Sequence, residues 1–169
     1  ETNGVTCYDT FTGFKFMAEK KNALEAAGEG KVIFSYEESY GYMLGDYVRD
    51  KDAVTASLLL TEMAAWYQSQ GMTLFDALQA LYEKYGYYGE KTHNLVMPGL
   101  DGLEKMASLM KGLRDAPPTE IAGVAVTTRT DYKDGAITDC ASGKVTSSEL
   151  RGSNVLRYAL ADGTVILVR

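Results

Sequence analysis

Apolar residues recur at helical spacing in four stretches of the chain, and residues that start or end helices flank these stretches. Asp52 and Thr73 are good N-caps, and Asp76, three positions after Thr73, makes an approximate capping box. Glycines at 28 and 30 and at 71 end the helices that precede them. The pattern therefore predicts helices over residues 14–27, about 53–70, about 74–85 and 100–113.

Two short runs rich in β-branched and aromatic residues predict strands before the first and the second of these helices. They cover residues 5–8 and 31–35, and the second run is apolar enough to predict a buried strand. Trp66 falls at helical spacing within its helix, which is typical of a core residue. Strands and helices in this order predict an α/β domain over residues 1–115.

The pattern of apolar and polar residues changes at the stretch "RDAPPTEIAG". Pro117 cannot continue a helix and pushes the residue before it toward extended geometry. Beyond this stretch apolar and polar residues alternate, and the Asp-Gly pairs at 134–135 and 162–163 are typical of hairpin turns. Residues 119–169 therefore predict an antiparallel sheet, which at about 50 residues is marginal as an independent unit.

Composition and charge narrow the range of partners. The formal net charge is -6 at pH 7, which argues against nucleic acid as the main partner. No apolar run approaches the ~20 residues of a membrane span, and the first residues lack the features of a signal peptide. Cys7 and Cys140 have no metal-ligand spacing, and a lone His93 cannot supply a zinc cluster. We therefore expect a cytoplasmic protein with reduced cysteines and no nucleic-acid or membrane partner.

A polar loop follows the second predicted strand. Glu37, Glu38 and Ser39 stand directly after it, and ligands of open α/β sheets bind beyond the carboxyl ends of the strands. Carboxylates and hydroxyls suit a polyol, and Arg49 and Lys51 further along suit a phosphate. Together these groups predict a sugar-phosphate site. The alternative is a solvated loop whose paired glutamates only face water.

A second candidate loop precedes the first predicted helix. The stretch "DTFTGFK" places Thr10, Thr12 and Gly13 just before that helix, where free backbone N–H groups favour anions. The alternative is that Thr12 serves only as a helix cap.

Three segments carry a resemblance to a known family. "TFTGFKFM", "FSYEESYGYMLGDYVRDKDAV" and "SNVLRYALADGTVILVR" resemble, in this order, segments of the α-D-phosphohexomutases, particularly the bacterial phosphoglucomutase/phosphomannomutase branch. That family has four domains around a central cleft. The resemblance implies that residues 1–115 are most of the third domain, a three-layer α/β/α domain that is N-terminally incomplete. Residues 119–169 would begin the fourth, an α+β domain with an antiparallel sheet, truncated before its phosphate-binding loop.

The resemblance also implies roles for the polar loop. Glu37 and Ser39 would hydrogen-bond the sugar hydroxyls, with Glu38 between them at a position that varies in the family. Lys51 matches the lysine that approaches the substrate, and Arg49 would support the loop. These five residues are the predicted sugar-recognition site.

Three further residues match other substrate-binding positions of the family. Thr12 and Gly13 match the threonine-glycine of the second substrate loop in the third domain, and Arg169 matches the first residue of the "RPSGTEP"-type phosphate loop. No "TASHNP"-like serine loop and no "DGDxDR"-like metal loop occurs in the chain. We therefore expect no catalytic residue and no metal site in these residues, and no activity of the chain alone.

The complete enzyme implied by the resemblance interconverts hexose 1-phosphate and hexose 6-phosphate. It would use a phosphoserine, Mg²⁺, and a hexose 1,6-bisphosphate as intermediate and activator. Its partners would be the hexose phosphate and the missing domains of the same parent chain, and exposed apolar surface would favour self-association of the piece. The alternative is a non-catalytic module that binds a sugar phosphate or a protein.

Overall fold

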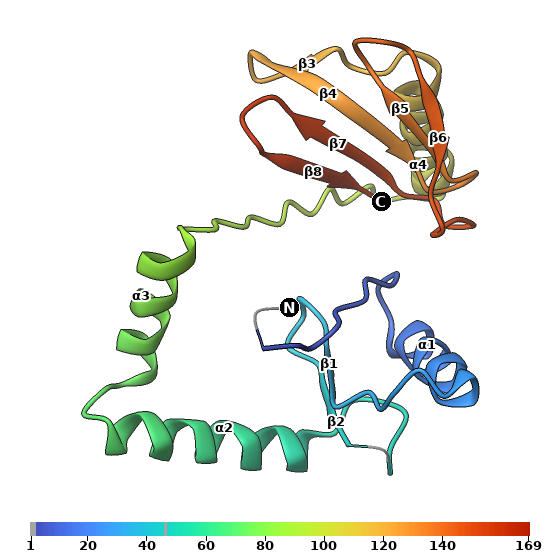
Figure 1. Cartoon of the computed structure of the whole chain (residues 1–169). Helices are drawn as coiled ribbons and strands as arrows, with labels where there is room; N and C mark the ends of the chain where they lie inside the picture. The colour runs from blue at the N-terminus through green and yellow to red at the C-terminus, as the bar shows by residue number, and fades with distance from the viewer. Residues whose placement is uncertain (1–2, 46) are drawn as a thin grey trace. The chain divides into compact units, whose positions relative to one another are not determined.

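A computed structural model describes residues 3–45 and 47–169, and the chain divides into two units, Glu1–Thr92 and His93–Arg169 (Figure 1). The α/β class predicted from the sequence is confirmed, because helices and short strands make up the first unit and an antiparallel sheet makes up most of the second.

The helices of the first unit begin and end close to their predicted limits: α1 spans Phe14–Ala27, α2 Ala53–Ser69 and α3 Leu74–Tyr85. Local capping explains these limits. Gly28 ends α1 in the left-handed conformation with φ of 70°. The carboxylate of Asp52 accepts hydrogen bonds from the first N–H groups of α2, and Thr73 and Asp76 form the capping box of α3 in both directions. The capping predictions are confirmed.

The strands of the first unit differ from the prediction. Residues 5–8 form no strand, and the run at 31–35 contributes only its end to β1, Phe34–Tyr36. This strand pairs antiparallel with β2, Tyr42–Leu44, through a turn in which Glu37 N–H donates to the carbonyl of Gly41 at 3.0 Å. The polar loop is therefore a hairpin turn, rather than a loop at the carboxyl edge of a parallel sheet.

Burial in the first unit also corrects two predictions. Ile33 is 57% exposed and Phe34 39%, so the predicted buried strand lies largely at the surface. Trp66, predicted as a core residue, is 59% exposed, and no residue of α2 is buried. The physical reason is that β1 has one pairing partner, β2, and that the contacts of α2 with β2 and α3 leave all of its residues at least partly exposed. The buried apolar side chains of this unit include Phe14 and Met43.

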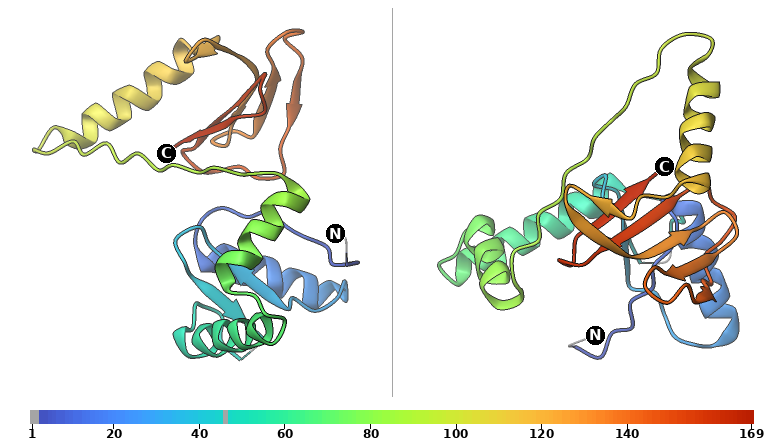
Figure 2. Two further views of the ribbon diagram at one scale, coloured as in Figure 1. Left: turned by 90° about the vertical axis from the view of Figure 1, so that its left-hand side faces the viewer. Right: turned by 90° about the horizontal axis from the view of Figure 1, so that it is seen from above.

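The second unit is an antiparallel sheet with one helix. Helix α4 spans Gly102–Asp115, and six strands follow it: β3 Glu120–Ile121, β4 Val124–Asp131, β5 Ala136–Asp139, β6 Val145–Ser147, β7 Leu156–Leu160 and β8 Val165–Val168. Their order is β6-β5-β4-β7-β8, with β3 paired to β4, and every pairing is antiparallel. Figure 2 shows this sheet from two further sides. The predicted antiparallel sheet and the turns at 134–135 and 162–163 are confirmed.

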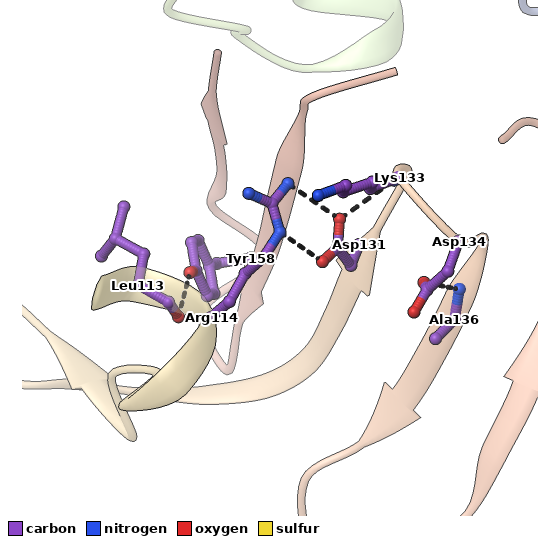
Figure 3. A network of polar contacts seen from close by, with 7 residues as sticks. All are labelled: Leu113, Arg114, Asp131, Lys133, Asp134, Ala136 and Tyr158. Atoms are coloured by element: carbon purple, nitrogen blue, oxygen red, sulfur yellow. Dashed lines mark hydrogen bonds and ion pairs between the residues drawn. The ribbon is translucent and has the colours of Figure 1, made fainter. Parts of the chain in front are cut away.

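Helix α4 is tied to this sheet by an apolar and a polar contact. Met110 joins the core cluster with Val126, Leu156, Tyr158 and Leu160. At the end of the helix, Nε and Nη2 of Arg114 donate to the two carboxylate oxygens of Asp131 at 2.6 and 3.1 Å, and the Tyr158 hydroxyl donates to the Leu113 carbonyl (Figure 3). The helix predicted at 100–113 thus packs within the second unit, and the predicted domain limit at 115–119 stays a prediction.

The charge on Asp131 is maintained despite its position. Burial is the largest influence and opposes ionisation, but hydrogen bonds from Arg114 and from the backbone N–H of Lys133 together hold the pKa of Asp131 below its ordinary value. Both side chains of the pair are about four-fifths buried, since 20% of Arg114 and 19% of Asp131 is exposed. An ion pair of this kind fixes the direction in which α4 meets β4.

Among the described residues, no helix combines the length and the apolar composition that a membrane crossing requires.

Candidate functional site

The β1–β2 turn presents the predicted recognition residues close together. The hydroxyl of Ser39 donates to Oε2 of Glu37 at 3.3 Å, and this is the hydrogen bond that the Glu37 carboxylate receives among the described residues. Tyr40, next in the turn, has a φ of 64° and is 85% exposed. A non-glycine residue in this region is uncommon and marks a backbone held by its surroundings.

Gly41 shows how tightly the turn is packed. A Cβ built on Gly41 would lie 2.8 Å from Cε2 of Phe14 and 3.1 Å from Cδ of Lys51. The same point is 3.3 Å from Oε2 of Glu37. The structure therefore brings Glu37 and Lys51, an acid and a base from different segments, to one backbone position, with Ser39 beside them.

The two basic residues of the predicted site have different surroundings. Nη2 of Arg49 lies 3.4 Å from Oε2 of Glu25 on α1, and Nζ of Lys51 lies 3.2 Å from its neighbour Asp50. The pKa of Glu25 lies below its ordinary value, mainly because of its hydrogen bond with Lys21 and to a smaller extent because of the Arg49 charge. Arg49 therefore contacts helix α1, as a supporting residue would, while the Lys51 side chain is 59% exposed.

The loop between the hairpin and α2 is anchored at Asp52. The Tyr47 hydroxyl donates to Oδ2 of Asp52 at 2.5 Å, and Thr55 and the backbone N–H of Val54 donate to the same carboxylate. These hydrogen bonds, that of Tyr47 first, lower the pKa of Asp52 to about 2. The charged carboxylate of Asp52 therefore holds the local backbone through these hydrogen bonds. Asp52 directly follows Lys51 in the sequence.

The second predicted loop meets the same place through Phe14. Gly13, and not Thr12, is the N-cap residue of α1, with φ of 122°, and no side chain caps the helix there. The alternative in which Thr12 is only a cap is therefore wrong. Thr12 is exposed, and Thr12 and Gly13 directly precede Phe14, whose ring approaches Gly41.

Two other predicted residues take no part in the contacts given above. Glu38 is exposed, between Glu37 and Ser39 in the turn. Arg169 belongs to the second unit, and its role in binding phosphate stays a prediction.

Sequence reasoning did not single out Phe14, Gly41, Glu25 or Tyr47. The contacts of Phe14, Gly41 and Glu25 join separate segments, and no local spacing signals such contacts; the contact of Tyr47 with Asp52 lies within one loop. One signal was available: Gly41 is a glycine at a turn, and glycine in a strand–turn setting often marks a close approach of another group.

A separate cavity of about 300 Å³ lies in the second unit beside Arg114, Arg129 and Thr138. None of the predicted site residues lines it. Its two carboxylates are already engaged, Asp131 by Arg114 and Asp134 by a backbone N–H, so we assign this cavity no ligand.

Known proteins with similar sequences place the loop in context. Residues 1–85 match the family described as phosphoglucomutase/phosphomannomutase, alpha/beta/alpha domain III. A phosphoglucomutase of Staphylococcus aureus (strain bovine RF122 / ET3-1) is 34% identical over 167 residues, which is 98% of this chain and 30% of the relative. A phosphoglucomutase of Staphylococcus epidermidis (strain ATCC 12228 / FDA PCI 1200) is 31% identical over 165 residues, with the same shares. The chain thus spans about 30% of the length of the curated relatives it matches.

Proposed function

Because this chain belongs to the phosphoglucomutase/phosphomannomutase family, we propose that it is the sugar-recognition part of an enzyme that interconverts hexose 1-phosphate and hexose 6-phosphate. The observation that carries the proposal is the meeting of Glu37, Ser39 and Lys51 around Gly41. A carboxylate and a hydroxyl can bind vicinal sugar hydroxyls, and a lysine whose side chain is largely exposed can bind the phosphate.

The proposed reaction takes place in two phosphoryl transfers. A phosphoserine elsewhere in the complete enzyme gives its phosphoryl group to the free hydroxyl of the sugar, which produces a hexose 1,6-bisphosphate. The intermediate then reverses its orientation in the cleft, and the serine takes back the other phosphoryl group. Phosphoryl transfer depends on positioning and charge stabilisation. The part of Glu37 and Ser39 is to hold the sugar in both orientations.

The described residues offer no site for the magnesium ion of such an enzyme. No group of three or more His, Cys, Asp or Glu among them could hold a metal ion. We therefore assign Mg²⁺ no ligand among the described residues and derive no step through it. The missing domains of the parent protein would supply both the metal ligands and the serine, and would be the partners of this piece.

We also propose a cytoplasmic location. Cys7 and Cys140 are both free and exposed thiols, a state that persists in a reducing compartment.

The test is an activity assay on the complete protein that contains these residues, with glucose and mannose phosphates and added Mg²⁺. We expect interconversion of the 1- and 6-phosphates by the complete protein and none by the 169-residue chain alone. Activity of the chain alone would contradict the proposal that the serine loop and the metal loop needed for catalysis lie in other domains. A complete protein that is inactive on every hexose phosphate would favour a non-catalytic binding module.

A further inference from the structure

Helix α1 and the recognition turn meet at a point with no spare room. Gly41 lies so close to the ring of Phe14 that an added Cβ would be 2.8 Å from Cε2, and it would also be 3.1 Å from Cδ of Lys51. Real Cβ atoms do not approach carbon atoms to 2.8 Å, so a side chain at position 41 would force the ring or the turn to move. The contact therefore fixes the distance between α1 and the turn.

Phe14 is the rigid member of this contact. It is the first residue of α1 and only 4% of it is exposed. The ring supports Lys51, whose Nζ lies 5.4 Å from the ring centroid, a cation–π distance. The Lys51 side chain is 59% exposed, and its Nζ donates to Oδ1 of Asp50 at 3.2 Å. Its stem lies against the apolar ring.

The carboxylate of Glu37 also lies close to Gly41. Its Oε2 is 3.3 Å from the same Cβ position, and it receives the Ser39 hydroxyl. The Lys51 stem and the Glu37 carboxylate can both approach this position because Gly41 has no side chain, and the ring of Phe14 bounds the same space.

We propose that Phe14 is a positioning residue for hexose-phosphate binding, which holds the Lys51 side chain next to Gly41 and Glu37. This rests on the proposed function. Phe14 does not touch the substrate; it acts through Lys51. It also directly follows Thr12 and Gly13, so the two candidate binding loops share one anchor.

The first test is steady-state kinetics of the complete protein with Phe14→Leu, which keeps an apolar side chain and removes the ring. We expect KM for glucose 1-phosphate to rise about three- to tenfold with kcat nearly unchanged, because a cation–π contact contributes uniform binding of this order. Gly41→Ala should raise KM in the same way. Phe16→Leu, the ring two positions along α1, is the matched control and should leave both constants unchanged.

A double-mutant cycle separates positioning from general loosening. In a Lys51→Met background, Phe14→Leu should have no further effect on KM, because the group that the ring positions is gone. An equal effect of Phe14→Leu with and without Lys51 would contradict the proposal, and so would an unchanged KM in a folded Phe14→Leu protein.

A spectroscopic readout on the 169-residue chain does not depend on activity. The proton resonances of the Lys51 methylenes should lie upfield through the ring of Phe14 and should move downfield in Phe14→Leu but not in Phe16→Leu. Unchanged Lys51 resonances would contradict the proposal. A wild-type complete protein with no hexose-phosphate activity contradicts the proposed function, whereas an active wild type with unchanged KM in Phe14→Leu contradicts only the positioning role.

Discussion

Two carboxylates in the same segment, Glu37 and Asp52, have opposite surroundings. Asp52 accepts from Tyr47, Thr55 and the backbone of Val54, and these bonds occupy both of its oxygens. Glu37 accepts only the hydroxyl of Ser39 among the described residues, at 3.3 Å. A carboxylate with free lone pairs can bind a ligand, and one that is already bonded holds the backbone. We therefore assign recognition to Glu37 and support to Asp52.

The low pKa of Asp52 predicts how the anchor depends on pH. Its pKa is lowered to about 2 in the folded chain, against about 3.9 for an unfolded Asp. A lowered pKa means that the stabilisation is fully present above about pH 4 and is lost as the pH falls through about 2. Asp52→Ala should lower the thermal midpoint at pH 6, and the difference from wild type should shrink between pH 4 and pH 2.

Circular dichroism melting curves at several pH values measure this difference. Glu62→Ala, an exposed position on the same helix, is the matched control and should show no such pH dependence. A difference between wild type and Asp52→Ala that stays constant down to pH 2 would contradict the assignment of the anchor.

At the residue scale, the sequence predicted those roles that follow from local rules. The caps at Asp52 and Thr73 were predicted because an N-cap bonds to N–H groups two or three residues away. The contact of Phe14 with Gly41 was not predicted, since it joins a helix to a distant turn. The types of group in the polar loop were recognised from chemistry, but only the structure shows that Glu37 and Lys51 approach the same point.

The helices were predictable where nearby residues in the sequence determine their ends. The limits of α1 and α3 follow from Gly28 and from the Thr73 capping box. The sequence predicted strand β1 a few residues before its observed position and predicted it to be buried. The prediction differs because a strand of three residues is defined by its partner β2 rather than by its own composition. The exposure of Trp66 has the same kind of cause, since spacing predicts which face of a helix is apolar and not what covers it.

Helix α4 provides an energetic test at the element scale. Asp131→Asn leaves Arg114 partly buried without its charged partner, and we expect a loss of about 1–2 kcal/mol in the free energy of unfolding. Chemical denaturation measures it. Asp115→Asn is the matched control on α4, because its pair with Lys111 is exposed and should contribute less than about 0.5 kcal/mol. Equal losses in the two variants would mean that the Arg114–Asp131 pair does not hold α4 to the sheet.

At the scale of the whole molecule, the apolar surface of α2 has a consequence for the isolated chain. Val54, Leu58 and Trp66 are 78%, 58% and 59% exposed. Apolar residues gathered on one exposed helix mark an interaction surface. We therefore predict that the 169-residue chain self-associates at high concentration.

Sedimentation velocity over a range of concentrations measures this association. Leu58→Asp should shift the chain toward monomer, because it places a charge on the apolar surface. Ser57→Asp adds the same charge at the neighbouring polar position and should have a smaller effect. A wild-type chain that stays monomeric at the highest concentration would contradict the prediction.

The central claim is that the β1–β2 turn recognises the sugar in a family enzyme, and one measurement tests it most directly. We would measure kcat/KM of the complete protein on glucose 1-phosphate for wild type, Glu37→Gln and Ser39→Ala, with Glu83→Gln on α3 as the control. The account predicts a loss of at least about tenfold in Glu37→Gln and a smaller loss in Ser39→Ala, since removing one hydrogen bond to a substrate costs about 1–2 kcal/mol. Full activity in both folded variants would mean that the turn is a solvated surface and that the recognition site lies elsewhere.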